Sequence, residues 1–381
     1  MRVTISVGGI FHAFYLANEL EKRGHLESIF TSFPRSHIDS YGVDRHRIRS
    51  FPLAGILKKA CGLFPWQSIA ETGERYAARL FDGRVERNLK PTDIFVGWSG
   101  VALKSLKKAK LLGAVTVLER GSTHIRFQRL ILQEEFSRLG VRPRLPQPEM
   151  VERELEEYDV ADYVCVPSSF AKETFIKEGM PERKIICINY GVDEQTFQPL
   201  SRRDDGFRVI FVGSLSVRKG VHYLLQAVAQ FHLRDLEVCL VGPLSAEMKP
   251  YLRKHRTSFT YIGCVAQEKL PSYYARSSVL VLPSVEEGFG LVILQAMACG
   301  LPVICTEQCG GAEIIQDGRD GFVVGPRDAE ALREKIEYLY QNRDLCRAMG
   351  ESARQKVCSG YRWQDYGENV VAAYRKILNS S

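Results

Sequence analysis

The stretch SVEEGFGLVILQAMACG places two carboxylates before a glycine–aromatic–glycine loop, which runs into an apolar segment with helical spacing. Gly288 and Gly290 leave backbone amides uncovered, and the first amides of a helix that begins near Leu291 attract phosphate. Because a diphosphate repels a carboxylate, Glu287 is predicted to accept hydrogen bonds from neutral hydroxyls. Gln295 follows roughly one helical turn later and leans back toward the helix start. This order of groups suits a sugar, a diphosphate and a ribose.

A simpler explanation of the two carboxylates is that both are solvated charges at a helix N-terminus, where the helix dipole favours acidic side chains. This explains one carboxylate easily, but it leaves the Gly-Phe-Gly sequence without a role. We therefore predict that Glu287 is functional and that Glu286 is its solvated neighbour.

The loop GSLSVRKG is a second candidate, because it follows the strand-like run FRVIFV and ends where a new helix is predicted. A cation beside the first amides of a helix is well placed to bind a diphosphate. Lys219 directly precedes Gly220, and we assign it to the ligand. For Arg218, a solvated basic loop is at least as good an explanation.

Two loops in the first half of the chain carry weaker signals. Gly8 and Gly9 end the first predicted strand, where glycines allow a ligand to approach the backbone. A tight turn explains them equally well, and they do not form the G-x-G-x-x-G pattern of dinucleotide-binding proteins. His124, in LERGSTHIRF, could line a cleft, although a single histidine is more often structural.

The composition limits the remaining classes of function. The net charge of +7 permits nucleic acid, an anionic membrane or a phosphorylated ligand. Zinc-type clusters and basic–aromatic repeats are absent from the sequence, which argues against nucleic acid. The 10 cysteines include no C-x-x-C pair, and several lie in apolar runs, so we expect free thiols in a reducing, cytoplasmic setting. No segment has the apolar length needed to cross a bilayer, and the N-terminus resembles a strand and a helix more than a signal peptide.

The elements that position these loops alternate along the whole chain, since short β-branched runs are followed by helical patterns. This alternation predicts α/β architecture with parallel sheets and right-handed crossovers. The pattern restarts after a polar, turn-rich linker at residues 189–206. We predict two doubly wound Rossmann-like domains that face a cleft, the first at 1–195 and the second at 200–360. A C-terminal helix at 361–381 is predicted to pack back on the first domain.

Taken together, SVEEGFGLVILQAMACGLPVICT, FVGSLSVRKG and INYGVDEQTFQP resemble the retaining family-four glycosyltransferases of GT-B fold, the glycosyl transferases group 1. The resemblance runs from Gly8-Gly9 to the helix that contains Trp363. It implies that 1–195 is the acceptor-side domain and 200–360 the donor-binding domain. It implies transfer of a sugar from a nucleoside-diphosphate sugar to an acceptor hydroxyl, with retention of the anomeric configuration. The implied acceptor is a glycan, a polysaccharide or a lipid-linked saccharide.

The resemblance also implies roles for individual residues. The E-x7-E motif of the family falls on Glu287, which would hold donor-sugar hydroxyls, and on Gln295, where the family has a ribose-binding glutamate. Glutamine accepts one hydrogen bond and donates another, so we expect ribose binding to weaken or to change its geometry. The diphosphate lysine of the family matches Lys219, and its first-domain histidine matches His124. Its partner arginine falls on Ser214.

We therefore predict that the catalytic residues are Glu287, Lys219 and His124. The predicted donor-binding set consists of Gly8, Gly9, Ser214, Arg218, Lys219, Gly288, Phe289, Gly290, Leu291, Val292 and Gln295. Because no D-x-D pair occurs, neither a metal nor another cofactor is expected.

Other functions stay open at this point. A sugar-nucleotide epimerase or an inverting transferase could use the same scaffold, and an inverting enzyme would need a base such as His124. Gln295 and Ser214 favour a third possibility, a catalytically silent subunit that binds a sugar nucleotide. The basic–apolar segment at 51–66 could touch an anionic membrane that carries a lipid-linked acceptor, which would place the protein at the inner membrane face. It could equally be an ordinary packed helix.

Overall fold

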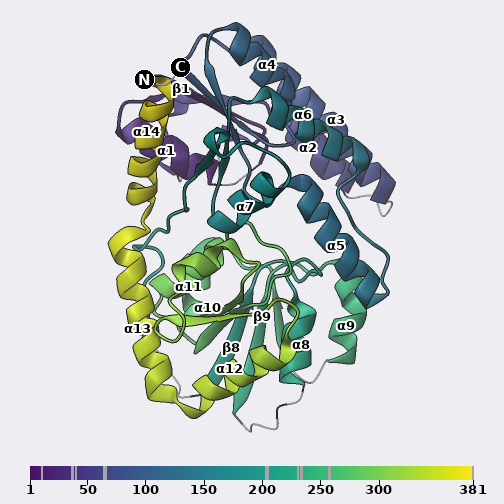
Figure 1. Ribbon diagram of the computed structural model, residues 1–381, viewed down its shortest axis with the longest axis vertical. Coiled ribbons are helices and arrows are strands. Elements are labelled where there is room, and N and C mark those ends of the chain that lie inside the picture. The colour runs from purple at the N-terminus through teal and green to yellow at the C-terminus, as the bar shows by residue number, and fades with distance from the viewer. Residues whose placement is uncertain are drawn as a thin grey trace.

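Two parallel sheets flanked by helices follow one another along the long axis of the computed structural model (Figure 1). The structure describes residues 1–9, 12–35, 38, 41–62, 67–201, 206–229, 231, 235–255 and 259–379. Within these ranges, none of the helices is both long and apolar enough to span a membrane.

The first sheet has seven strands in the order β3-β2-β1-β4-β5-β6-β7, all parallel. Its strands are β1 (Val3–Val7), β2 (Leu26–Thr31), β3 (Ile48–Ser50), β4 (Ile94–Trp98), β5 (Val115–Glu119), β6 (Tyr163–Val166) and β7 (Ile185–Cys187). β1 and β4 are buried along their whole length, and β4 is accordingly apolar throughout, whereas β1 also buries Thr4 and Ser6. The strand order reverses between β1 and β4, and ligands of such sheets bind beyond this point.

The helices of the first domain are α1 (Ala13–Lys22), α2 (Pro52–Gly62), α3 (Gln67–Asn88), α4 (Leu103–Leu111), α5 (Ile125–Leu139), α6 (Pro148–Val160) and α7 (Ser169–Lys177), with short 3-10 turns η3 (Arg45–Arg47) and η4 (Glu182–Lys184). α2 and α3 pack against each other as a hairpin, and α3 also packs against α4. α5 extends from the first domain toward the second (Figure 1).

The second sheet has six parallel strands in the order β10-β9-β8-β11-β12-β13. Its strands are β8 (Phe207–Val212), β9 (Leu236–Val241), β10 (Thr260–Gly263), β11 (Val279–Leu282), β12 (Val303–Thr306) and β13 (Gly321–Val324). Its helices and 3-10 turns are α8 (Val221–Val228), η5 (Ala246–Met248), α9 (Lys249–Lys254), η6 (Gln267–Lys269), α10 (Leu270–Tyr274), α11 (Leu291–Ala298), η7 (Gly310–Ile314), α12 (Ala329–Gln341) and α13 (Arg343–Gly360). The predicted fold class, two doubly wound α/β domains, is confirmed.

The last helix, α14 (Trp363–Asn379), returns to the first domain and lies beside α1 (Figure 1). Gly367 allows this close contact, because a Cβ atom at this position would lie 2.7 Å from the Cβ of Glu19. At the start of the helix, the indole of Trp363 stacks on the ring of Tyr15, with 4.2 Å between centroids. The start of α14 is therefore anchored on α1 where the chain crosses back.

Candidate active site

The strand order of the second sheet reverses between β8 and β11, and the two predicted ligand loops follow these strands. A cavity of about 370 Å³, which we call the donor cavity, opens there between the domains. Its lining from the second domain is Val212, Gly213, Lys219, Gln267, Glu287, Phe289, Gly290, Leu291, Val292 and Gln295. The rest of its lining is His12, Tyr15, Tyr41, Gly121, Tyr190, Gly191, Val192, Asp193, Phe197 and Trp363. Most of the predicted second-domain site is thus brought together.

α11 begins at Leu291, as the sequence predicts. Its first backbone amides have no hydrogen-bond acceptor within the helix. Gly290 precedes it in the left-handed conformation, with a φ of 87°. A Cβ atom at Gly290 would also lie 3.0 Å from Leu282 and 3.1 Å from the Cys309 sulfur, so a larger residue would be strained and crowded. Because Leu291 and Val292 both line the cavity, the helix start offers it an anion-binding edge.

Lys219 and Glu287 are in direct contact in the lining of the donor cavity. The Lys219 ammonium pairs with the Glu287 carboxylate, and the Arg218 guanidinium lies 3.6 Å from the other carboxylate oxygen. Burial, and then the charge of Arg218, lower the pKa of Lys219 to about 7. The adjacent Glu287 carboxylate acts in the opposite direction, because it stabilises the charged ammonium. The predicted diphosphate cation and sugar-binding carboxylate therefore form one coupled pair.

Glu286 is fully buried, so the prediction of a solvated neighbour is wrong. Its carboxylate accepts hydrogen bonds from the hydroxyls of Ser122 (2.7 Å) and Thr123 (2.8 Å), and from the side chain of Gln128 (2.9 Å). Arg218 donates a further bond of 2.6 Å from its Nε. Burial alone would raise the pKa of Glu286, but Arg218 and these hydrogen bonds outweigh it and hold the pKa well below its usual range. Glu286 thus ties the loop after β11 to the first domain, and it occupies Arg218.

Gly288 also lies at the contact between the domains. A Cβ atom there would come within 2.3 Å of the Gly121 carbonyl oxygen. The Gly288 carbonyl accepts a bond of 2.6 Å from the Ser168 hydroxyl. Its predicted place in the donor-binding set is therefore corrected: this glycine allows the close approach of two backbones.

α5 carries a second buried contact between the domains. The Glu135 carboxylate accepts a bond of 2.6 Å from the Tyr223 hydroxyl and lies 2.9 Å from His222 Nε2, both on α8. Arg327 donates to the same carboxylate at 2.7 Å. Together with the bonds of Glu286 near the start of α5, these contacts hold both ends of the helix against the second domain.

His124 does not belong to the donor cavity lining, which corrects its predicted place in the cleft. It caps α5, where its Nδ1 accepts a bond of 3.3 Å from the Arg126 amide. Its ring packs between Tyr158 and Phe175, with centroids 5.1 Å and 4.9 Å away. Burial, and then the charge of Arg120, lower the pKa of His124 to about 4, so the ring stays neutral near pH 7.

His12 is a histidine that does line the donor cavity, and the sequence analysis missed it. It stands just before α1, with its Nε2 3.3 Å from the Glu119 carboxylate and its ring 4.1 Å from that of Tyr190. The available signal was its position after Gly8 and Gly9, at the carboxyl end of β1.

Gly8, Gly9 and Ser214 lie outside the donor cavity lining, in contrast to their predicted role. Gly8 and Gly9 line a separate cavity of about 330 Å³ in the first domain, together with Trp98 and Gly100. The Gly8 carbonyl accepts a bond of 2.7 Å from the hydroxyl of Ser32, which directly follows β2. The loop after β1 therefore contributes glycines to this cavity and His12 to the donor cavity.

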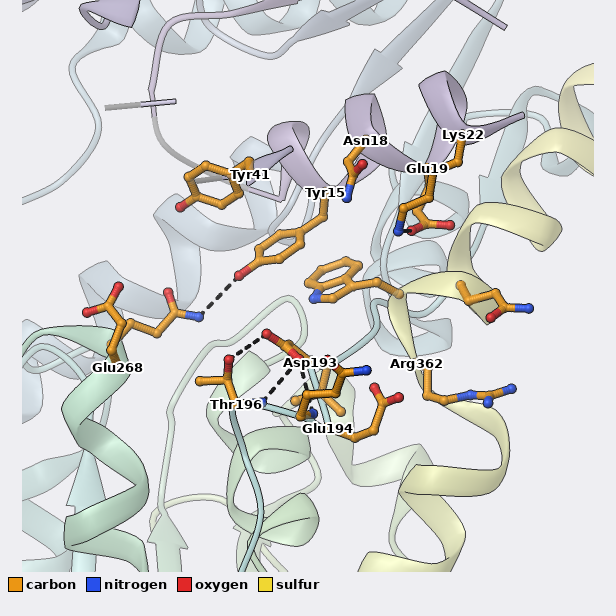
Figure 2. A pocket seen from close by; sticks show the side chains of 15 residues that line it. Tyr15, Asn18, Glu19, Lys22, Tyr41, Asp193, Glu194, Thr196, Glu268 and Arg362 are labelled. Carbon is orange, nitrogen blue, oxygen red and sulfur yellow. Dashed lines mark hydrogen bonds and ion pairs between the residues drawn. The ribbon is translucent and has the colours of Figure 1, made fainter. Parts of the chain in front are cut away.

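A third cavity, of about 470 Å³, adjoins the donor cavity along the connection between the domains (Figure 2). Both cavities share Tyr15, Tyr41, Val192, Asp193, Gln267 and Trp363 in their linings. Gln267 donates a bond of 3.3 Å to the Tyr15 hydroxyl, which joins the two domains across the cavity (Figure 2). Its walls come from α1, the connection, η6 and the start of α14, so no continuous motif marked it in the sequence.

Throughout the part of the chain that the structure describes, His, Cys, Asp and Glu side chains nowhere form a group of three or more that could hold a metal ion.

Comparison with known proteins gives one family match and many structural neighbours. Residues 192–356 match the family described as glycosyl transferases group 1. A D-inositol 3-phosphate glycosyltransferase of Pseudarthrobacter chlorophenolicus is 32% identical over 230 residues, which are 54% of this chain and 55% of that protein. The chain thus spans just over half the length of this relative.

Two solved structures resemble the whole chain. Sucrose-phosphate synthase of Thermosynechococcus elongatus has a TM-score of 0.72 at 19% identity, and covers 100% of both chains. The HepE protein of Anabaena, in complex with UDP-glucose, has a TM-score of 0.68 at 17% identity, also with 100% of both chains. At these identities the likeness concerns the fold, the two-domain arrangement called GT-B. The whole chain thus has the GT-B fold, and its residues 192–356 match the glycosyl transferases group 1 family.

Proposed function

We propose that the chain transfers a sugar from a nucleoside-diphosphate sugar to an acceptor hydroxyl, with retention of the anomeric configuration. The observation that carries this proposal is the order of groups in the donor cavity. Glu287, Lys219 and the first amides of α11 lie together at the switch point of the second sheet, and Gln295 follows within the helix. The UDP-glucose complex of HepE, a protein of the same fold, supports the class of donor.

The chemical task of this site is to stabilise the departing diphosphate. Lys219 and the preorganised α11 amides do so electrostatically, and the loss of one such donor typically costs ~10²–10³ in rate. Arg218, which is also in the predicted donor-binding set, pairs with Glu286. Lys219 is therefore the cation assigned to the diphosphate. The departing phosphate oxygen can accept the acceptor proton, so this course needs no separate base.

The experiment that tests the proposal is a screen of nucleotide sugars against the purified chain. A ligand at about 100 times its dissociation constant stabilises a protein by about 2.7 kcal/mol, which raises the melting temperature measurably. Each stabilising sugar nucleotide is then tested for release of its nucleoside diphosphate with a panel of saccharides. Binding without turnover for every acceptor would favour the silent-subunit alternative, and no stabilisation at all would contradict the proposal.

Gln295 offers a test of the ribose position. Its Oε1 lies 3.4 Å from the Tyr274 hydroxyl, so its amide NH₂ is the group left for the ligand. Gln295→Glu supplies acceptors for both the tyrosine and a ribose hydroxyl. We expect tighter binding of a ribonucleoside diphosphate and a smaller gain for its 2′-deoxy analogue. Calorimetric titrations compare the two ligands, and equal changes for both would place the ribose elsewhere.

Activity in the presence of a chelator is the second test. The sequence contains no D-x-D pair, and Lys219 supplies the positive charge that a metal would otherwise supply. Transfer, or hydrolysis of the donor, is expected to continue at an unchanged rate in excess EDTA. Loss of activity with EDTA and its return with manganese or magnesium would contradict this mechanism.

The cavity beside Gly8 and Gly9 is the proposed acceptor site. Its volume of about 330 Å³ lies within the range of small-molecule pockets, and its roof is formed by the α2–α3 hairpin. On the outside of this hairpin, Leu53, Ile56 and Tyr76 are 63%, 60% and 62% exposed. An acceptor site directly beneath exposed apolar side chains supports a lipid-linked acceptor at a membrane surface.

Liposome binding tests this membrane contact. Exposed Lys59 and Arg79 lie on the same hairpin as the apolar side chains, while residues 63–66 of the predicted segment lie outside the described residues. We expect the protein to sediment with anionic liposomes at low salt and to be released as salt rises, since attraction is screened over about 8 Å at physiological ionic strength. Leu53→Ser/Ile56→Ser should weaken sedimentation. Equal sedimentation of wild type and variant would assign the contact to another surface.

A further inference from the structure

The side of the donor cavity opposite Glu287 contains a buried histidine–carboxylate pair. His12 is 5% exposed and lines the cavity, while Glu119, at the carboxyl end of β5, is 1% exposed. The Nε2 atom of His12 lies 3.3 Å from a Glu119 carboxylate oxygen. Among the described residues, His12 has no hydrogen-bond partner at its other ring nitrogen, Nδ1. One nitrogen is therefore held by the protein, and the other is available to a ligand.

Glu119 determines which nitrogen carries the proton. In the neutral tautomer that donates from Nε2 to this carboxylate, Nδ1 keeps its lone pair. Three buried hydroxyls surround this carboxylate, those of Tyr190, Tyr366 and Tyr374, and burial raises the pKa of each well above its usual value. They stay protonated, and none of them has a hydrogen-bond partner in the described part of the chain. Glu119 thus lies near neutral groups, and its Oε1 likewise has no hydrogen-bond partner among the described residues.

The free Nδ1 lone pair selects its ligand by charge. A lone pair repels the oxygens of a phosphate, but it accepts a hydrogen bond from a hydroxyl. Glu287, the proposed acceptor of sugar hydroxyls, lines the same cavity from the other domain, and so does Phe289. A sugar that Glu287 holds on one side therefore presents its remaining hydroxyls to the first domain.

We propose that Nδ1 of His12 accepts a hydrogen bond from a hydroxyl of the transferred sugar, and that Glu119 acts as a positioning residue that keeps His12 in the accepting tautomer. The proposal rests on the proposed function, since it assumes a sugar nucleotide in the donor cavity. It names a residue that selects the donor sugar, in place of His124, whose Nδ1 is used within α5.

The test combines variants with a series of donors. It uses the full chain and the nucleotide sugar found in the screen, with analogues that each lack one sugar hydroxyl. His12→Ala should lower kcat/KM for the parent donor by about 10- to 100-fold, the cost of leaving a buried hydroxyl unpaired. For one analogue, the one without the contacted hydroxyl, His12→Ala and wild type should react equally. His12→Asn keeps an oxygen bonded to Cγ, where histidine has Nδ1, and should recover part of the lost activity.

Glu119→Gln provides the second readout. The glutamine amide can donate to Nε2, which moves the ring proton to Nδ1 and removes the lone pair. We expect Glu119→Gln to lower kcat/KM for the same donors as His12→Ala, and to match wild type for the analogue without the contacted hydroxyl. Tyr374→Phe, a control from the same buried cluster, should stay close to wild type. Affinity for the free nucleoside diphosphate should not change in any of these variants.

An equal loss for every donor in the series would overturn the assignment, because the effect would then be structural. If wild type binds nucleoside diphosphates but transfers no sugar from any donor, the proposed function fails instead. In that case the hydroxyl contact is judged from binding of the parent nucleotide sugar and its analogues to wild type and His12→Ala, and equal affinities would contradict it.

Discussion

Lys219→Ala should raise the dissociation constant of a nucleoside diphosphate by about 10- to 100-fold and leave that of the free nucleoside nearly unchanged. A charge-assisted hydrogen bond contributes about 1.5–3 kcal/mol, and each 1.4 kcal/mol is a factor of ten. The nucleoside lacks the phosphates that Lys219 contacts, so it should not sense the change. Turnover should fall by ~10²–10³, because the same cation stabilises the leaving diphosphate. Calorimetric titration of both ligands measures the difference.

The control for this variant is its effect on the fold. Removing Lys219 leaves the buried Glu287 carboxylate with only the more distant Arg218, 3.6 Å away, so the melting temperature should fall as well. Lys219→Arg keeps a positive charge and should retain more of the diphosphate affinity. A loss that is equal for nucleoside and nucleoside diphosphate would remove Lys219 from the diphosphate site.

Glu287→Ala should lower turnover strongly while the affinity for free nucleoside diphosphate stays equal or increases. Glu287 pairs with Lys219 in the structure, so the diphosphate must compete with this carboxylate for the ammonium. Its removal ends that competition, but it also removes the acceptor proposed for the sugar hydroxyls. The free diphosphate has no sugar and should not sense the second loss. Single-turnover kinetics with the donor, and calorimetry with the diphosphate, separate the two effects.

Glu287→Gln is the matched variant. It keeps one acceptor oxygen and removes the charge, so we expect activity between those of wild type and Glu287→Ala. If Glu287→Ala abolishes binding of free diphosphate, this residue supports the phosphate site and not the sugar site.

Local patterns of the second domain were readable from the sequence. Glycines on both sides of Phe289, followed by an apolar run, predicted a loop and a helix start, and α11 begins at Leu291. Lys219 before Gly220 predicted a cation at a helix start, and α8 begins at Val221, directly after Gly220. These predictions succeed because strand, loop and helix are continuous in the chain.

Contacts between distant segments were not readable in this way. Glu286 was predicted to be solvated, yet its carboxylate accepts a hydrogen bond from Ser122, 164 residues earlier. No local sequence pattern indicates such a partner. The resemblance to the family placed a first-domain histidine at His124, but spacing does not reveal where a ring points. In the structure, this ring turns into the core beside Phe175, and His12 takes the position at the cavity.

A crystal structure of the chain with its nucleotide-sugar donor, or with a non-hydrolysable analogue, tests the central claim most directly. We predict the diphosphate against Lys219 and the first amides of α11, with the sugar between Glu287 and the first domain. The nucleoside should extend toward Gln295. A donor whose diphosphate lies away from Lys219 and α11, for example in the third cavity of Figure 2, would contradict the account.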